Sequence, residues 1–409
     1  MKKIEKILLF LLVFFFPSQL AYHFWPKFAY LFGIRVDYLA PTVYLTDILI
    51  FLLILFSFNR LKKIEWRQKV PVLVLVGVYA FFNVYLAKSH LLAMLKWLTF
   101  IKLALFGIYL YLCNLRGLKK LIISALSLSV AIFSLIGIGQ FLIKSTIGGP
   151  LYYLGERHFS VNTPGMALTT LFGKEYLRAY STFPHPNALA GYLAVAVLII
   201  VTLRGEKNFF KKASGWLLLL LASLCFILTF STGAFVALAV VLIMRATWLL
   251  FAKQAKKLIL LIYFISIGIS FLLPVVNISP LSGTALFRKN LRDRFYLAEI
   301  SAKLFSQNPL YGKGMNNFIP VAAKSFSLNR TVFAQPVHNL FLLIMAEGGI
   351  IGLVFLFYLF FLAINKGKPL LLSLAFLFII ITGIGDHYWL TLQQNQLLLV
   401  FLFGISFKK

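Results

Sequence analysis

A histidine and an asparagine stand together at the head of a long apolar run late in this sequence. The stretch is QPVHNLFLLIMAEGGIIGLVF, residues 335–355, in which Pro336 precedes a helix expected to begin near His338 and Asn339. Amides that are free at a helix N-terminus favour an anion and keep a nearby imidazole neutral. A neutral imidazole suits the role of a general base, so His338 is the first candidate for proton transfer.

A second histidine lies in STFPHPNALAGYL, residues 181–193, directly before another apolar run. Pro184 and Pro186 fix their own φ angles and push the preceding residues toward extended backbone, and Asn187 suits a helix N-cap. This stiff turn has two interpretations. Either His185 faces a substrate, or it belongs only to a rigid cap at the membrane surface.

Arginine side chains near these stretches are candidates for binding phosphate groups. Arg178 precedes the histidine turn, and Arg292 and Arg294 open the segment RDRFYLAEISAKLFSQNPLYGKGMNNF, residues 292–318. The first half of this segment has helical periodicity, and its second half is a loop rich in Gly and Asn. Because a guanidinium fork matches the oxygens of a phosphate, Arg292 and Arg294 are predicted to hold a pyrophosphate.

An acidic side chain inside an apolar run is a functional candidate by default. Glu347 lies nine residues after His338, so the two face nearly opposite sides of a straight helix. A lysine partner is the alternative interpretation, and Lys96 and Lys102 lie within another apolar run. The glycines that follow Glu347 permit close packing or a kink.

The eleven Asp and Glu residues form no D-x-D pair, no H-E-x-x-H motif and no Walker loop. Metal-dependent sugar-nucleotide transfer and ATP-driven transport therefore have no motif to support them. We predict no metal site and no cofactor. The two cysteines, Cys113 and Cys225, both fall inside apolar runs and are expected to be small core residues.

The elements that must position these residues are membrane-spanning helices. The chain has 409 residues, of which 61% are hydrophobic and 12% are charged, and its mean hydropathy is +0.91. Repeated apolar stretches of about 17–25 residues are the signature of transmembrane helices, so we predict an all-α polytopic membrane protein with about twelve of them. The predicted spans lie at roughly 7–16, 44–58, 71–87, 91–113, 121–143, 187–203, 215–230, 233–251, 258–276, 338–364, 369–384 and 389–407.

The net charge of +29 would suit a nucleic-acid ligand, but the placement of the charges argues against one. Lys and Arg gather in alternate links between the predicted spans, which is the pattern of cytoplasmic loops. No A-x-A-like site follows the first apolar run, so we expect a retained span and not a cleaved signal peptide. Both termini are therefore predicted to be cytoplasmic.

The predicted organisation has five parts, two of which are long links on the outer side. The parts are N-terminal transmembrane helices (1–143), a first outer loop (144–186), middle transmembrane helices (187–276), a large outer loop with short helices (277–337) and C-terminal transmembrane helices (338–409). The large loop carries eight basic and two acidic residues, a net charge of +6. An anionic ligand at the outer face would explain this excess, and attraction to anionic lipid head groups is the alternative.

Together these stretches resemble the O-antigen ligase/polymerase family of bacterial envelope glycosyltransferases. The features that carry the resemblance are Arg178 with STFPHPN, FSTGA at 230–234, Arg294 with NPLYGKGMNNF, HNLFLLIMAEGGIIG at 338–352 and the ending DHYWLTLQQNQLLLVFLFG at 386–404. The similarity covers roughly residues 20–405, and its most specific part is the two outer loops.

This resemblance implies a GT-C-like, metal-independent transferase that acts at the outer face of the cytoplasmic (inner) membrane. Its donor would be a glycan on undecaprenyl pyrophosphate, and its acceptor a glycan, a lipid or a protein. The family's histidine matches His338, which is implied to deprotonate or position the acceptor hydroxyl. The family's arginines match Arg178 and Arg294, or Arg292 in a shifted register, and are implied to neutralise the pyrophosphate.

One departure from the family pattern concerns these phosphate contacts. Thr232 stands where many members have an arginine, so one contact is missing or is supplied by Lys96 or Lys102. Supporting roles in the site are expected for His185, Asn187, Asn339 and Glu347.

Other functions remain open at this point. A flippase for lipid-linked oligosaccharides is the main alternative, because many spans and interior cations suit it, although no internal symmetry is visible. A peptidoglycan glycosyltransferase would share the lipid donor, but we would expect its key acid in an outer loop. A non-catalytic envelope scaffold is the fourth interpretation. The sequence does not distinguish ligation, polymerisation and protein glycosylation.

Overall fold

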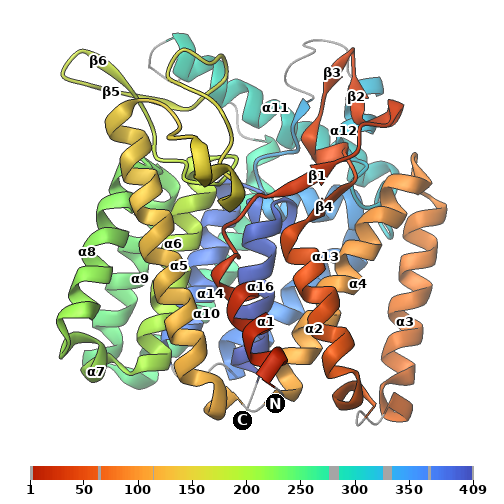
Figure 1. Ribbon diagram of the computed structural model, residues 1–409. Coiled ribbons are helices and arrows are strands. Elements are labelled where there is room, and N and C mark those ends of the chain that lie inside the picture. The colour runs from red at the N-terminus through yellow and green to blue at the C-terminus, as the bar shows by residue number, and fades with distance from the viewer. Residues whose placement is uncertain are drawn as a thin grey trace.

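The computed structural model describes residues 3–62, 66–113, 115–275, 285–325, 334–366 and 370–407. Its body is a bundle of long helices that run between two ends of the molecule (Figure 1). These helices are α1 (Lys3–Phe14), α2 (Leu45–Leu61), α3 (Trp66–Tyr85), α4 (His90–Leu112), α5 (Leu115–Ile143), α6 (Pro186–Arg204), α8 (Ala213–Leu228), α9 (Thr232–Leu250), α10 (Ala252–Leu272), α13 (Leu340–Lys366), α14 (Leu370–Gly385) and α16 (Gln393–Ser406).

A helix occupies each segment that was predicted to span the membrane, within a few residues. Among the described residues, five helices are long and apolar enough to cross a bilayer. They are His90–Leu112, Gly117–Ile143, Pro186–Arg204, Thr232–Leu250 and Leu340–Asn365. Shorter apolar helices lie at Val70–Tyr85, Ala213–Leu228, Lys257–Leu272 and Leu370–Gly385. The fold is therefore that of a mostly helical, multi-pass membrane protein, and the total of twelve spans stays a prediction.

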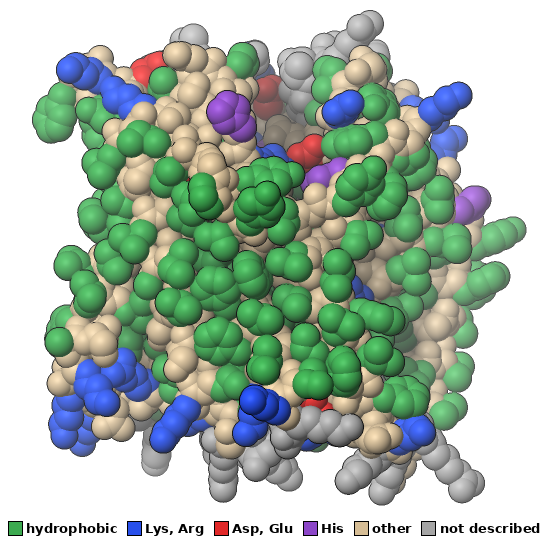
Figure 2. All heavy atoms as spheres, viewed as in Figure 1, with side chains coloured by type: hydrophobic (Ala, Val, Ile, Leu, Met, Phe, Trp, Pro, Cys, Tyr) green, Lys and Arg blue, Asp and Glu red, His purple; other side chains and the backbone are tan. Residues whose placement is uncertain are grey.

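The two ends of the bundle differ in what they carry. The start of α1 and the end of α16 lie at the lower end in Figure 1, where the short helix α7 (Glu206–Phe210) also lies. At the opposite end lie α11 (Ala285–Gln307), α12 (Phe318–Ser325) and the β-hairpins. Figure 2 shows a broad hydrophobic belt between the ends, with Lys and Arg side chains along its lower rim. Such a belt above a basic rim is typical of a membrane-embedded surface with a cytoplasmic edge.

Short strands at the upper end depart from the all-α prediction. β1 (Ala21–His23) pairs with β4 (Thr42–Tyr44), β2 (Tyr30–Leu31) with β3 (Ile34–Arg35), and β5 (Leu168–Leu171) with β6 (Lys174–Leu177), all antiparallel. Short 3₁₀ turns accompany them: η1 (Lys27–Ala29), η2 (Asp37–Leu39), η3 (Gly149–Leu154) and η4 (Leu273–Val275). Strands of two to four residues are too short to show a period of two, so no periodic pattern marks them in the sequence.

Helix α13 is broken about two and a half turns after its start, and the loop after α11 fills the break. Gly349 has a φ of 66°, outside the helical region. The backbone of the loop replaces the missing helical hydrogen bonds: Lys313 N donates to Ala346 O (2.8 Å) and Ile350 N donates to Pro309 O (2.8 Å). The glycine-rich part of NPLYGKGMNNF is therefore a fixed structural insert, and of the two possibilities that the glycines permit, the kink occurs at Gly349.

The carboxylate of Glu347 anchors the same loop. It accepts hydrogen bonds from the backbone amides of Asn316 (2.9 Å) and Phe318 (3.0 Å), and its side chain is buried. Lys96, one of the two lysines considered as its partner, donates instead to Leu390 O (2.8 Å), and Lys102 pairs with a different acid. Glu347 thus holds the loop to α13 through backbone amides, and no lysine donates to its carboxylate among the described contacts.

Replacing Gly312 with alanine should destabilise this junction. Gly312 has a φ of +70°, and a Cβ there would collide with the backbone of Glu347. Left-handed backbone costs a non-glycine residue about 1–2 kcal/mol, and overpacking adds about 1–3 kcal/mol. A lower melting temperature of detergent-solubilised protein, read by size-exclusion chromatography after heating, would reveal the loss. Gly173→Ala is the matched control, because Gly173 has a φ of +74° with no atom within 4 Å, so it should lose only the first amount. Equal melting temperatures for the two variants would contradict the proposed close fit.

Candidate active site

The head of α13 is fixed by Asn339 at the upper end of the bundle in Figure 1. The Oδ1 of Asn339 accepts the backbone amides of Phe341 and Leu342, both at 2.9 Å, as a helix cap does. Its Nδ2 donates to Ile384 O (2.9 Å) at the end of α14, so the cap also joins two helices. His338 lies directly before this cap, as predicted, and its buried Nδ1 has no hydrogen-bond partner.

The head of α6 is capped by His185 and not by Asn187, which corrects the sequence prediction. His185 has extended backbone, and its Nδ1 accepts the amide of Asn187 (3.2 Å), with Pro186 as the first helical residue. A proline at that position needs no hydrogen-bond acceptor, so the PHPN turn is a good helix start. The cap leaves the side chain of Asn187 available for other contacts.

The amide of Asn187 bridges two charged side chains from distant parts of the chain. Its Oδ1 accepts Arg178 Nη2 (2.9 Å), and its Nδ2 donates to Asp386 Oδ2 (3.0 Å). Arg178 follows β6, and its Nε also donates to Thr229 O (2.6 Å) in the turn between α8 and α9. That turn directly precedes Thr232, the position at which many members of the resembling family have an arginine. The segment that carries this departure from the family pattern therefore contacts Arg178.

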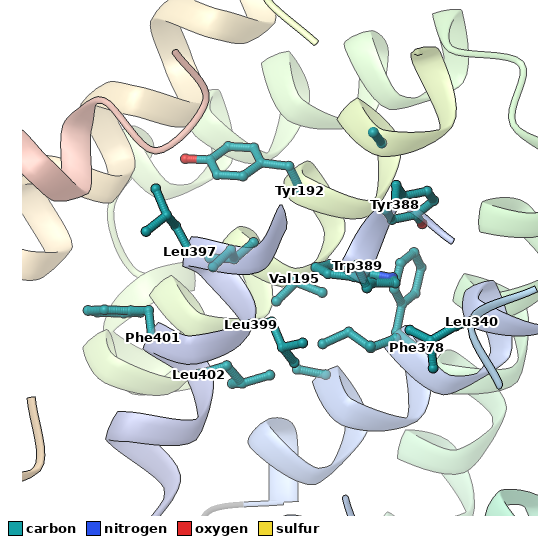
Figure 3. Packing of buried hydrophobic residues seen from close by; sticks show 14 of the residues in the cluster. Tyr192, Val195, Leu340, Phe378, Tyr388, Trp389, Leu397, Leu399, Phe401 and Leu402 are labelled. Atoms are coloured by element: carbon teal, nitrogen blue, oxygen red, sulfur yellow. The ribbon is translucent and has the colours of Figure 1, made fainter. Parts of the chain in front are cut away.

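Asp386 and His387 lie in the link between α14 and the short helix α15 (Tyr388–Thr391). Two buried aromatic residues anchor this link, and Figure 3 shows both packed among α6, α14 and α16. Trp389 Nε1 donates to Thr382 Oγ1 (3.0 Å). A Cβ on Gly191 would lie 2.7 Å from the hydroxyl of Tyr388, so only glycine lets α6 approach this closely.

These segments converge on one polar cluster, which we define as His185, His338, Asp386, His387, Arg178 and Arg294. The rings of His338 and His387 have centroids 5.5 Å apart. The positive charge of Arg294, from α11, acts electrostatically on the three histidines and on Arg178. Figure 2 shows histidine, acidic and basic side chains inside a hollow at the upper end.

The structure favours Arg294 over Arg292 as the loop arginine of this cluster. Two residues apart on a helix are about 200° apart around its axis, so both cannot point to the same site. Both side chains are exposed, but of these two arginines only Arg294 acts electrostatically on the cluster histidines. Arg288, Lys289 and Arg330, which contribute to the predicted loop charge, have side chains outside the described part.

Burial sets the charge states in the polar cluster. It lowers the pKa of His185 to about 4, and it also lowers the pKa of His338, with a further contribution from His387. Burial alone would raise the pKa of Asp386, but the surrounding imidazoles and the hydrogen bond from Asn187 outweigh it and lower that pKa. At neutral pH the site therefore presents neutral imidazoles beside an ionised carboxylate.

A cavity of about 520 Å³ opens beside the polar cluster. Its wall meets the cluster at Tyr38, whose ring lies 5.5 Å from that of His387, and at Thr391, whose hydroxyl bonds His387 Nδ1 at 2.8 Å. Lys102 lines this cavity and not the polar cluster, since its Nζ lies 2.5 Å from Asp47 Oδ1. The ammonium of Lys102, which was expected to contact a phosphate, is thus already paired with the carboxylate of Asp47.

Asp386, His387, Tyr38 and Asp47 are site residues that the sequence analysis did not single out. The pair Asp386–His387 offered one signal, because an acid beside a histidine between two apolar runs is unusual. No comparable signal marked the segment of the short strands. Within the described residues, no group of three or more His, Cys, Asp or Glu side chains is arranged to hold a metal ion.

A helical membrane bundle with a polar site of arginines and histidines at one end defines a class of multi-pass membrane proteins that act on polar or charged substrates. Residues 216–357 match the family model described as O-antigen ligase (Wzy_C). This match, which includes Arg294 and His338, supports an assignment to the O-antigen ligase/polymerase family and a membrane glycan-transfer function of that general type. It also indicates a multi-pass protein of the inner membrane. A search among curated proteins gave no match.

The low pKa of His185 predicts that the protein loses stability in acid. The unfolded chain takes up a proton on this residue below about pH 6.5, whereas the folded protein resists it until about pH 4. The contribution is therefore present above pH 6.5 and is lost as the pH falls toward 4. His185→Gln should flatten part of this dependence in melting temperatures measured from pH 4 to 8. His158→Gln is the control, because His158 is exposed at the same end. A profile for His185→Gln as steep as that of the control would count against a buried neutral imidazole.

Proposed function

We propose that this protein transfers a glycan from undecaprenyl pyrophosphate to an acceptor hydroxyl at the outer face of the cytoplasmic membrane. The acceptor is a second glycan, a lipid or a protein. The proposal refines the family's general activity by naming the lipid diphosphate donor, the side of the membrane and the residues that act. It needs no cofactor and assigns charge stabilisation to protein side chains.

The reaction has one bond-forming and one bond-breaking event. The acceptor oxygen attacks the anomeric carbon of the donor sugar, and the bond from that carbon to the diphosphate oxygen breaks. Undecaprenyl diphosphate leaves with the electron pair, and the acceptor proton passes to the imidazole of His338. General-base help of this kind contributes typically about 10²–10⁴-fold.

The convergence of His338 with two arginines at one site carries this proposal. The His338 Nδ1 is buried without a partner, and an unmatched buried polar atom is costly unless a ligand or water uses it. Arg294 is exposed beside it and free to approach a diphosphate, whereas Arg178 is held by Thr229 O and Asn187. Preorganised cations stabilise a departing oxyanion strongly, because they need no reorganisation during the reaction.

Asp386 is a positioning residue in this proposal. Its Oδ1 accepts the amide of His387 (2.8 Å), and its Oδ2 accepts Asn187, which in turn orients Arg178. The carboxylate also favours protonation of the imidazoles beside it. It therefore stabilises the charge that His338 gains when it accepts the proton.

The orientation in the membrane belongs to the same proposal. We place the polar cluster and the segments 144–186 and 277–337 outside, all twelve long helices across the bilayer, and both termini in the cytoplasm. The basic lower rim supports this direction, since Lys and Arg favour the cytoplasmic side. The GT-C-like classification rests on the same arrangement of spans and outer loops.

A reconstituted transfer assay tests the proposal. Purified protein in proteoliposomes is supplied with a labelled oligosaccharide on undecaprenyl pyrophosphate and with candidate acceptors. A ladder of chain lengths would identify a polymerase, and a single shift of a lipid or protein would identify a ligase. His338→Ala should reduce transfer about 10²-fold or more, while His158→Ala, at an exposed site, should not. Intact donor carried across the membrane without cleavage would replace the proposal with a flippase.

The two loop arginines provide a matched pair. Arg294→Ala should lower kcat/KM about 10²–10³-fold, because it removes a cation that stabilises the leaving diphosphate. Arg292→Ala removes the same type of side chain two residues earlier on the helix. No interaction of Arg292 with the cluster histidines exists among the described residues, so this variant should change kcat/KM less than about 3-fold. The reverse order of effects in the same assay would exclude Arg294 as the diphosphate ligand.

A further inference from the structure

The cavity beside the polar cluster differs from that cluster in how its charges are matched. Its cations are Lys96, Lys102 and Arg157, and two of them have a carboxylate partner: Lys102 has Asp47 at 2.5 Å and Arg157 has Asp37 at 3.0 Å, while Lys96 Nζ donates to Leu390 O (2.8 Å). A diphosphate carries charge that needs unmatched cations. Paired charges, by contrast, offer strong hydrogen bonds without a net field.

A hydrogen-bonded network lies deep in this cavity. Asp47 Oδ1 accepts Lys102 Nζ and also Gln393 Nε2 (2.7 Å), and Asp47 Oδ2 accepts the amide of Tyr44 (3.1 Å). Gln19 also lines the cavity, and its buried Oε1 has no partner. The cavity thus combines carboxylate, ammonium and amide groups with an acceptor atom that no protein group satisfies.

Aromatic side chains form another part of the wall. Phe24, Tyr38 and Tyr44 line the cavity, together with Thr42 and Thr99. Flat aromatic rings pack against the C–H faces of a sugar, while carboxylates and amides bind its hydroxyls. The volume of about 520 Å³ lies within the usual range of about 300–1,000 Å³ for small-molecule sites.

We propose that this cavity is the acceptor subsite and takes a sugar unit of the acceptor glycan. The proposal rests on the proposed glycan transfer and adds the location and chemistry of the second substrate. Tyr38 and Thr391 are shared between the cavity and His387, so a sugar held there presents a hydroxyl to the histidine pair. Donor and acceptor then meet at His338, with the diphosphate at Arg294.

Two-substrate kinetics test this assignment. Full-length protein in nanodiscs is assayed with labelled donor and with the acceptor identified by the transfer assay, each varied in turn. Asp47→Asn weakens a charge-assisted hydrogen bond and should raise the acceptor KM roughly 10- to 100-fold, with the donor KM changed less than about 2-fold. Undecaprenyl pyrophosphate without sugar is the probe for the donor site, and its thermal protection of the protein should not change.

Asp47 is a partly buried ion-pair partner, so Asp47→Asn can fail to fold. A second variant keeps the test valid in that case. Thr99→Phe fills the cavity from α4 and leaves Asp47 itself unchanged, and it should raise the acceptor KM by a similar factor. Ile101→Phe is its matched control, since Ile101 lies on the exposed apolar face of α4 and should leave both KM values unchanged.

The outcomes separate this inference from the proposed function. A rise in the donor KM, or weaker protection by undecaprenyl pyrophosphate, in the Asp47 or Thr99 variant would make the cavity a donor subsite and overturn the inference. Unchanged KM values in folded Thr99→Phe protein would also overturn it, with the proposed function intact. If the wild-type protein never cleaves the donor, the proposed function and the inference fall together.

Discussion

The side-chain bridge from Arg178 through Asn187 to Asp386 is the interaction on which the polar cluster depends. It joins the end of a β-hairpin, the head of α6 and the link after α14 with two hydrogen bonds, at 2.9 and 3.0 Å. Each end of the bridge has a further fixed contact, to Thr229 O and to the amide of His387. A buried amide between opposite charges satisfies both of them without bringing them into direct contact, which leaves the guanidinium of Arg178 able to meet an anion.

A second constraint sets the position of the loop helix that carries Arg294. Ser301 on α11 donates to Leu342 O of α13 (2.6 Å), and the loop after α11 is locked into the break of α13 by Glu347. Because α13 also begins at the cap that follows His338, one helix fixes both the imidazole and the arginine. The break costs α13 part of its own hydrogen bonding, and the loop backbone restores it.

Local signals in the sequence predicted much of this arrangement. The helix after His338, the periodic segment that became α11, and the stiff turn at His185 all depend on residues within a few positions of each other. The bridge to Asp386 spans 199 residues, and nothing near Asn187 indicates such a partner. The same limit explains Glu347, whose role follows from a loop that folds back onto it, and Lys102, whose carboxylate lies 55 positions away. The cap on α6 was misassigned because histidine rarely competes with asparagine for that role, and only the two prolines fix the register.

Gln393, in the first turn of the final helix, has a consequence for biogenesis. Two helices made early in synthesis, α2 and α4, carry Asp47 and Lys102, and the amide that completes the pairing of these two groups arrives only with α16. A lone charge in a bilayer is expensive, so α2 and α4 must associate with each other soon after insertion and wait for the last segment. A nascent chain that stalls before residue 393 would lack this amide and keep an incompletely solvated acid in the lipid. Membrane quality control would then recognise the unfinished protein by its exposed carboxylate.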